Sequence, residues 1–370
     1  MHYSGMTLYH NHKISSPNHM QHHPTDHKIG RLIPWQGKDY RYFSGTAYLG
    51  MGSVPPFEQE ILQGIQQYGP NHGASRFSNV QLEVYEDLEQ QFASGARAPY
   101  AALLSSGFMA GYLTQTLLCE MAHTVWAAPD AHPAILPANY QPDPDQSFHE
   151  FANECIQKSH QVKGQTIAIL SNAVDTILPA IHDFNWVKDL SPANTYYLLV
   201  DDSHAFGLLG KGIYGTYHQW KNLPAHLIVA GSLGKALAIP AGIILGDAYF
   251  IEKVKSSATF RGASPPAPGY CQAFLQAEKL YEQQQTLLQE NMEYFFKRID
   301  NTSDQLRYDP RFPVVTFKNS GWAPKLLEAG MMISSFSYPR PEDAPVDRII
   351  LSAYHTKEDL AHLASAIVSG

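Results

Sequence analysis

Short apolar segments alternate with helix-like segments from about Gln81 to Ile299. The first helix is indicated by apolar residues at helical spacing: Leu82, Tyr85, Leu88 and Phe92. Six short apolar runs then read as strands: Ala101–Leu104, Thr124–Ala128, Thr166–Leu170, Tyr196–Val200, Leu227–Ala230 and Gly242–Leu245. A further helix is expected to open at Gly107. Short apolar strands separated by helices predict an α/β fold, with a mostly parallel sheet covered on both faces.

The pattern changes after three prolines, at Pro265, Pro266 and Pro268. A long helical stretch is expected from about Tyr270 to Ile299. Residues 301–370 then resemble a smaller α+β unit, with strands at Val314–Phe317 and Arg348–Ser352 and a last helix from Thr356. We therefore expect an arm and the start of a small domain over 1–45, a large α/β domain over 46–265, and a linking helix with the small C-terminal domain over 266–370. A ligand is expected at the junction of the two domains.

Composition narrows the class of partner. The 370 residues carry a net charge of −8 without a Lys/Arg run, which argues against a nucleic-acid or membrane-surface partner. The cysteines, Cys119, Cys155 and Cys271, have no metal-ligand spacing and indicate a reducing compartment. No run of about 18 apolar residues and no signal-peptide pattern is seen. These features predict a cytoplasmic protein.

Histidines crowd the first 27 residues. Their spacing matches no common metal site, so we expect a polar arm rather than a metal centre: His2, His10, His12, His19, His22, His23 and His27.

Two segments carry the chemistry. In Leu198-Leu-Val-Asp-Asp-Ser-His-Ala-Phe-Gly207, an apolar strand ends in Asp201, and His204 follows three residues later. An acid at the carboxyl end of such a strand faces the ligand crevice and needs a cationic or proton-donating partner there. In Leu227-Ile-Val-Ala-Gly-Ser-Leu-Gly-Lys-Ala-Leu237, a single lysine, Lys235, follows the next strand among small residues. A partly desolvated lysine there can act as a nucleophilic amine.

These pieces, with others in the same order, resemble the α-oxoamine synthase family of fold-type I enzymes that depend on pyridoxal 5'-phosphate (PLP). The resemblance runs from about Asp39 to the C-terminus. Beside the Asp201/His204 and Ser232/Lys235 segments it rests on these motifs: Asp39-Tyr-Arg-Tyr-Phe-Ser-Gly-Thr-Ala-Tyr-Leu-Gly50, Tyr68-Gly-Pro-Asn-His-Gly-Ala-Ser-Arg76, Ser105-Ser-Gly-Phe-Met-Ala110, Pro129-Asp-Ala-His132, Phe260-Arg-Gly-Ala-Ser-Pro-Pro266 and Leu351-Ser-Ala-Tyr-His-Thr-Lys-Glu-Asp359. It implies a seven-stranded type of sheet in the large domain and a homodimer.

The resemblance also assigns roles. Lys235 would carry the cofactor as a Schiff base and move the proton at the substrate's α-carbon. Asp201 would pair with the pyridinium nitrogen, His204 would hydrogen-bond the phenolic oxygen, and His132 would stack on the ring. The residues assigned to the phosphate are Ser106, Gly107, Phe108, Ser232 and Arg261; for Ser106 a plain helix N-cap is an equally good interpretation.

The sequence departs from the family pattern at positions where the family binds the substrate and the phosphate. Arg261-Gly262 stands where the family has a serine/threonine pair, and Arg261 could reach the phosphate across a dimer interface. Tyr85 replaces a histidine, and Ser171-Asn172 replaces a Glu-Ser pair. No arginine stands at the expected carboxylate-binding place, near Ser335 or Phe336, and Arg340 is the nearest candidate.

The leading hypothesis is therefore condensation of an amino acid with an acyl thioester, usually acyl-CoA. The altered carboxylate site motivates an alternative, the same cofactor used by an aminotransferase, aldolase or decarboxylase. A non-catalytic protein that kept the fold is a third possibility. A nucleotide-binding Rossmann protein is a fourth, and the lack of GxGxxG after an early strand counts against it.

Overall fold

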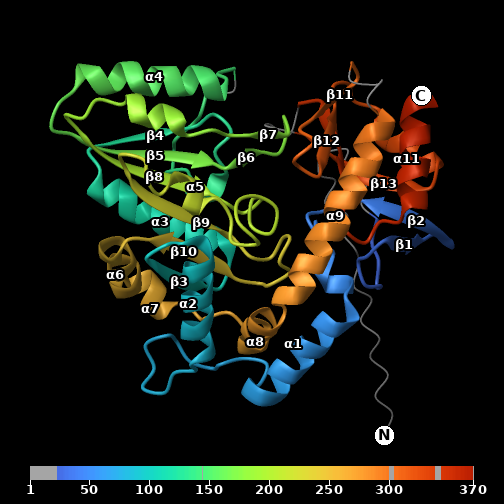
Figure 1. Cartoon of the computed structure of the whole chain (residues 1–370), viewed down its shortest axis with the longest axis horizontal. Helices are drawn as coiled ribbons and strands as arrows, with labels where there is room; N and C mark the ends of the chain where they lie inside the picture. Colours follow the sequence, from blue (N-terminus) through green and yellow to red (C-terminus); the bar gives the residue numbers. More distant parts are fainter. Residues whose placement is uncertain (1–22, 144, 300–303, 338–342, 370) are drawn as a thin grey trace, which may run out of the picture.

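Two six-stranded sheets organise the part of the chain described by the computed structural model, which comprises residues 23–143, 145–299, 304–337 and 343–369. Figure 1 shows the larger α/β layer on one side and the second sheet on the other, with the long helix α9 lying along the second sheet beside α11. The histidine-rich residues 1–22 and Arg340 lie outside the described residues.

The first sheet contains the six strands expected from the sequence. Their spatial order is β3 (Tyr100–Leu104), β10 (Gly242–Gly246), β9 (His226–Ser232), β8 (Thr195–Asp201), β5 (Thr166–Asn172) and β4 (Thr124–Ala127). The pairs β4–β5, β5–β8 and β8–β9 are parallel, whereas β10 is antiparallel to both of its neighbours. The sheet thus has six strands among the described residues rather than seven, because no seventh apolar segment pairs with it.

Helices cover both faces of this sheet. Consecutive residues of β8 belong to different core clusters: Leu198 and Val200 pack in one, Leu199 in the other. A strand buried on both faces has to be continuously apolar, which explains why these runs do not alternate with polar residues. The helices around the sheet are α2 (Val84–Ala96), α3 (Gly107–Met121), α4 (Phe148–Gln161), α5 (Tyr217–Trp220), α6 (Ala248–Ser256) and α7 (Ala258–Gly262). Short 3-10 turns are η1 (Met51–Ser53), η2 (Pro133–Ile135) and η3 (Asn185–Asp189).

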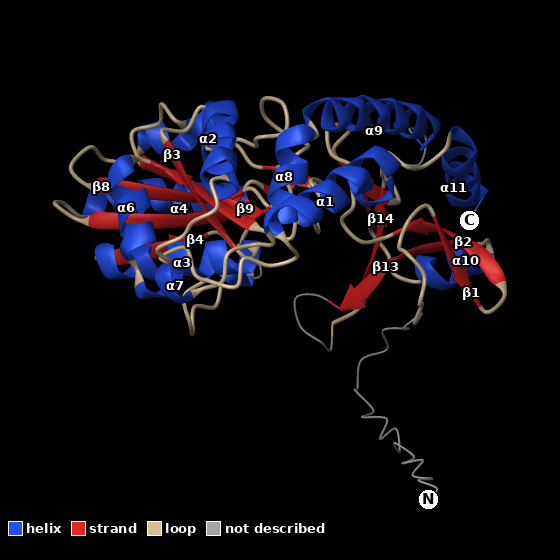
Figure 2. Cartoon of the chain, turned by 90° about the horizontal axis from the view of Figure 1, so that it is seen from below, coloured by secondary structure: helices blue, strands red, loops and turns tan. Residues whose placement is uncertain are grey.

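The second sheet joins the two ends of the described chain (Figure 2). Its order is β1 (Leu32–Trp35), β2 (Lys38–Phe43), β13 (Met331–Ser337), β14 (Pro345–Ile350), β12 (Val314–Phe317) and β11 (Leu306–Tyr308). Only the β2–β13 pair is parallel. Two helices belong to this part, α10 (Trp322–Glu328) and α11 (Lys357–Ser369). Arg31 and Arg41 tie the N-terminal strands to α11, because both guanidinium groups donate to the buried Asp359 carboxylate at 2.9–3.0 Å.

Three helices connect the two sheets: α1 (Pro55–Tyr68), α8 (Pro268–Gln276) and α9 (Glu278–Ile299). α1 packs closely on α8, since a Cβ added at Gly64 would lie 2.5 Å from the Gly269 carbonyl oxygen. The expectation of one long helix from Tyr270 was wrong, because Ala277 leaves helical geometry between α8 and α9. A single non-helical residue barely disturbs the apolar periodicity, so the pattern did not reveal the break. No described helix is long and apolar enough to cross a membrane.

Candidate active site

A cavity of about 780 Å³ lies where the carboxyl ends of β5 and β8 meet strands β13 and β14 of the second sheet. Its wall brings together four residues that the sequence singled out: His132, Asp201, His204 and Lys235. The remaining wall comes from the loop after β4, the start of α4, the short hairpin β6 (Val174–Asp175) and β7 (Ala180–Ile181), and two residues of the second sheet, Phe336 and Arg348.

Asp201 is the last residue of β8 and is buried. Its Oδ1 accepts a hydrogen bond from the Ser203 amide at 2.8 Å, which leaves its other oxygen available to a ligand. The neighbouring Asp202 is fully buried and points elsewhere, because it accepts from the amide and the hydroxyl of Thr216 at 2.6 and 2.8 Å. Burial raises the pKa of Asp202 to about 7. Of the two acids, Asp201 is therefore the one that serves the cavity.

Lys235 lies in the loop that follows β9, which ends at Ser232. The loop turns sharply at Ala238, whose φ of +56° is unusual for a residue with a side chain. Desolvation lowers the pKa of the Lys235 amine to about 8; Asp201 opposes this shift and Arg348 adds to it. A substantial share of the amine is therefore unprotonated in neutral to mildly alkaline solution, which a nucleophilic lysine requires.

His204 is held by a residue that does not line the cavity. Its Nδ1 lies 2.8 Å from the hydroxyl oxygen of Tyr48, whose side chain is fully buried. Burial lowers the pKa of His204 well below its usual value, and Lys235 and Arg348 lower it further, so the imidazole is neutral. If His204 Nδ1 carried the proton, the buried Tyr48 hydroxyl would have to accept a hydrogen bond from it. The hydroxyl's own proton would then have no acceptor, which is costly in a buried place. Tyr48 therefore donates to Nδ1, and His204 offers Nε2–H to the cavity.

His132 stands in the loop after β4. Its Nδ1 accepts from the Ala134 amide at 3.1 Å, and its backbone amide donates to Asn172 Oδ1 at 3.0 Å. Burial lowers the pKa of the ring, against the opposing effect of Asp201. Asn172, one of the positions that departs from the family pattern, also donates to the Asp130 carbonyl. Asn172 thus connects β5 to the His132 loop through its side-chain amide.

Arg348 is a site residue that the sequence analysis missed. It is a buried residue of β14, its Nη1 donates to the Thr176 carbonyl at 3.4 Å, and its guanidinium lies 5.0 Å from the Phe336 ring. Its Nε is buried without a hydrogen-bond partner, and no carboxylate of the described residues forms an ion pair with it. Burial lowers its pKa. A buried cation that lacks an anionic partner is suited to receive one from a ligand.

No arginine stands at the expected carboxylate-binding place, as the sequence indicated, but Arg348 brings a guanidinium to the same cavity. Phe336, at the expected place, lies on β13, and the cation comes from the neighbouring strand. The only sign of Arg348 in the sequence is that a charged residue begins the apolar run Arg348-Ile-Ile-Leu351. Without the sheet order, such a residue is interpreted as the solvent-exposed end of a strand.

The residues assigned to the phosphate lie beside the cavity rather than in its wall. Ser106 is the N-cap of α3, and its Oγ accepts from the Met109 amide at 3.2 Å, as the structural interpretation of this serine expected. The next two amides, of Gly107 and Phe108, open the helix and have no acceptor within it. A Cβ at Gly107 would lie 2.3 Å from Ser232 Cβ, so the helix start and the β9 loop are in direct contact. Such a helix start can receive an anion.

Arg261 is not brought to the cavity within one chain. It is exposed at the end of α7, and its guanidinium lies 4.1 Å from the ring of Phe77, which is itself exposed. Tyr85, which replaces the family's histidine, is buried and donates to the Pro266 carbonyl at 2.9 Å. Tyr85 therefore has a structural partner, whereas a role for Arg261 at the phosphate remains a prediction.

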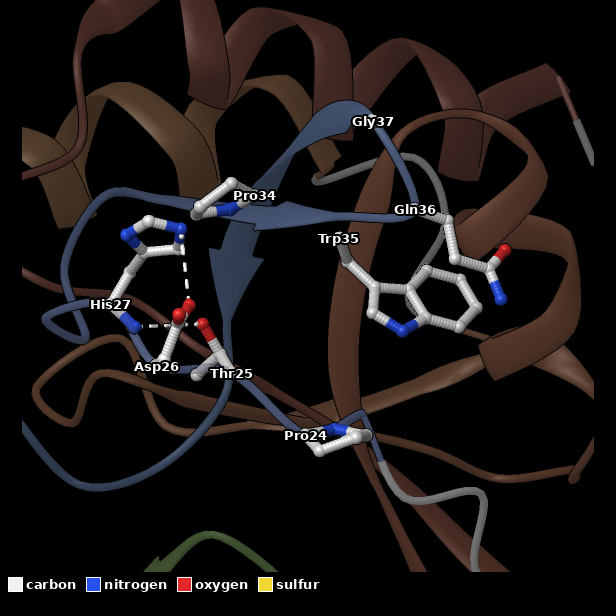
Figure 3. A pocket seen from close by; sticks show the side chains of 8 residues that line it. All are labelled: Pro24, Thr25, Asp26, His27, Pro34, Trp35, Gln36 and Gly37. Carbon is white, nitrogen blue, oxygen red and sulfur yellow. Dashed lines mark hydrogen bonds and ion pairs between the residues drawn. The ribbon is translucent and has the colours of Figure 1, made fainter.

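A second cavity, of about 630 Å³, lies between residues 24–27 and the β1–β2 turn (Figure 3). His27 pairs there with Asp26 at 3.2 Å, and Trp35 forms part of the wall. It contains none of the residues from the chemical motifs. Within the described ranges, no group of three histidine, cysteine or acidic side chains is arranged to hold a metal ion.

Comparison with known proteins decides the family. The model of the aminotransferase class I and II family matches residues 166–367, more than half of the chain, and covers Asp201, His204, Lys235 and Arg348. The chain belongs to the aminotransferase class I and II family. Membership agrees with the cavity's position at the carboxyl ends of the parallel strands.

The chain is also similar to individual proteins of known name. An 8-amino-7-oxononanoate synthase of Lysinibacillus sphaericus is 22% identical over 349 residues, covering 90% of each sequence. Among solved structures, a serine palmitoyltransferase of S. paucimobilis with bound PLP–myriocin superposes with a TM-score of 0.76 at 15% identity, covering 92% of this chain and 89% of that one. An 8-amino-7-oxononanoate synthase of Francisella tularensis gives 0.68 at 21% identity, covering 89% and 97%. The resemblance to the α-oxoamine synthases and the fold-type I architecture are confirmed.

Proposed function

We propose that this protein is a PLP-dependent enzyme that condenses an amino acid with an acyl thioester. The observation that carries the proposal is the cluster of Lys235, Asp201 and His204 in one cavity, with the pKa of the lysine lowered to about 8. Its sequence relatives named 8-amino-7-oxononanoate synthase and the PLP-bound serine palmitoyltransferase structure support the same assignment.

The residues present fit this cofactor. Asp201 offers a carboxylate to a protonated ring nitrogen, His204 offers Nε2–H to a ring oxygen, and the open amides at the start of α3 suit a phosphate. When bound, PLP supplies an electron sink that stabilises negative charge at the substrate's α-carbon. Asp201, by keeping the ring nitrogen protonated, would strengthen that sink.

The chain's own groups would supply binding and proton transfer. Arg348, with its unpartnered Nε, would bind the amino acid's carboxylate and orient the α-carbon toward Lys235. Lys235 would remove the α-proton with its amine and hold it at Nζ, which its lowered pKa permits at neutral pH. His204 would remain a neutral donor throughout, because Tyr48 occupies its Nδ1.

Arg348 also bears on the alternative reactions. Transamination, aldol cleavage and decarboxylation were motivated by the apparent loss of the carboxylate-binding arginine. Because Arg348 supplies a buried guanidinium to the same cavity, that motive disappears. No observation in the described structure favours one of these reactions over condensation.

We further infer a homodimer. The start of α3 carries two large exposed side chains, Phe108 and Tyr112, which are 58% and 51% exposed, and Phe77 beside Arg261 is 53% exposed. Exposed apolar side chains of this size beside a ligand site are typical of a surface that another chain covers. Light scattering should therefore give twice the chain mass; a fully active monomer would refute this.

The test of the proposed function has two steps. The purified protein with added PLP should develop a yellow absorbance band, and borohydride should attach the cofactor to Lys235, as peptide mass mapping would show; Lys235→Ala should lose both. Glycine, alanine and serine are then supplied with acyl-CoA, and release of free thiol is followed. No attachment of PLP would refute the cofactor assignment. Attachment without thiol release from any pair would refute condensation.

A further inference from the structure

One part of the cavity wall, apart from the motif residues, has its own chemistry. It is made by the loop after β4, the first turn of α4 and the β6–β7 hairpin, which Figure 1 shows reaching from the α/β layer toward the second sheet. We call this wall the outer lobe and define it by its apolar members: Pro133, Phe148, Val174, Ile177, Leu178 and Ala180. The proposed reaction places a second substrate beside the amino acid, and the outer lobe is the remaining part of the same cavity.

Two carboxylates also line this part of the cavity, those of Asp130 and Asp175. Asp130 pairs through Oδ2 with His182 Nε2 at 2.8 Å, while its Oδ1 is buried without a partner. Asp175 is buried and accepts from the amides of Ile177 and Leu178 at 2.7 and 3.0 Å, which fixes the turn of the hairpin. His182 is in turn stacked on Phe148, with ring centroids 3.7 Å apart. The lobe therefore combines an apolar surface with two acidic groups, which would repel an anion.

The cations of the cavity have other partners in the proposed function, and Arg348 touches the hairpin only through the Thr176 carbonyl, at 3.4 Å. Among the described residues of its wall, the only lysine and arginine are Lys235 and Arg348, and in the proposed function the cofactor and the amino acid occupy both. The first turn of α4 also offers no anion site, because Ser147 and Glu150 cap each other reciprocally there. An anionic group entering the outer lobe would lose its water and meet two acids without gaining a positive partner.

We propose that the outer lobe binds the acyl chain of the thioester and selects chains that end in an uncharged, apolar group over chains that end in a carboxylate. This inference rests on the proposed function. From the reacting carbonyl, a thioester extends in two directions: the acyl chain and the thiol carrier. CoA carries phosphates, which the two acids exclude from this lobe, so the lobe suits the acyl chain. The discrimination against a terminal carboxylate comes from Asp130 and Asp175, whereas Leu178 is one position of the apolar wall.

Leu178 allows the selectivity to be weakened by a single substitution. It is 51% exposed at the hairpin turn and lines the cavity, so substitution there leaves the core intact. Leu178→Lys adds a cation to the lobe, and Leu178→Gln is the matched uncharged control. The probes are heptanoyl-CoA and pimeloyl-CoA, seven-carbon chains that differ by one terminal carboxylate. Each thioester is tested for thiol release with the amino acid that gives the fastest release in the test of the proposed function. Non-reactive thioether analogues of the two thioesters are tested for binding by calorimetry.

We expect kcat/KM for heptanoyl-CoA to exceed that for pimeloyl-CoA by about tenfold or more, and the analogues to bind in the same order. Leu178→Lys should reduce the ratio to within about threefold by improving pimeloyl-CoA, and Leu178→Gln should preserve it. Equal or better binding of the pimeloyl analogue by the unchanged protein would overturn the inference, as would equal ratios for the two variants. If neither thioester releases thiol, condensation itself fails, and the calorimetry still decides what the lobe binds.

Discussion

Removing the Tyr48 hydroxyl tests whether Tyr48 determines which ring nitrogen of His204 carries the proton. Tyr48→Phe keeps the buried ring, which packs against Phe312 at a centroid distance of 5.9 Å, and deletes only the bond to Nδ1. Without Tyr48 neither tautomer of the neutral imidazole has a partner at Nδ1. The preference for Nε2–H, and with it the donor to the cofactor's oxygen, should therefore be lost.

The expected size follows from the burial of both groups. A hydrogen bond of this kind contributes about 1 kcal/mol net, and a buried polar atom left without a partner costs about 1–3 kcal/mol. Tyr48→Phe should therefore lower the free energy of unfolding by about 1–2 kcal/mol. It should also weaken PLP binding by about tenfold, which corresponds to about 1.4 kcal/mol.

Nitrogen NMR of histidine-labelled protein without cofactor reads the tautomer directly, and fluorescence titration with PLP reads the affinity. The control is Tyr196→Phe, which removes another buried hydroxyl whose acceptor, the Ser191 carbonyl at 2.9 Å, lies at the far end of β8. The control should lose comparable stability without a change in tautomer or PLP affinity. Finding Nδ1–H in the unchanged protein, or the same PLP affinity in Tyr48→Phe, would refute the reasoning.

Two further predictions concern the cations of the cavity. Arg348→Gln should raise KM for the amino acid by about 10–100-fold, because a charge-assisted carboxylate contact is lost, and should leave PLP binding within about twofold; Arg348→Lys should recover only part of the loss. If equilibrium titrations showed that Arg348→Gln weakens the binding of the amino acid and of PLP equally, Arg348 would instead have a structural role. The rate of PLP attachment should rise with pH with its midpoint near 8, because burial lowers the pKa of Lys235 to about 8 and the unprotonated amine is the reactive form. Asp201 raises that pKa, so Asp201→Asn should move the midpoint to lower pH; a stopped-flow profile with its midpoint near 10 would contradict the assignment.

Local sequence was sufficient for the strands and for the chemical motifs. All six apolar runs of the first sheet became strands because a strand covered on both faces must be continuously apolar, and this requirement is visible in the residues. Asp201 and His204 stand three residues apart, and Lys235 follows the next strand. Because β8 and β9 are parallel neighbours, their carboxyl ends meet at one edge, and the order of the motifs predicted that these groups would meet.

Tertiary structure alone decided which distant side chains complete the cavity. Arg348 reaches it because β14 pairs with β13 and its Nη1 bonds the β6–β7 hairpin, a contact between residues 172 positions apart. Tyr48 reaches His204 across 156 positions. Neither approach leaves a local periodic signal, since each depends on strand order and on how the second sheet faces the first. The sequence by itself therefore determined the groups that follow each strand, whereas only the folded chain determined which cation and which hydroxyl those groups face.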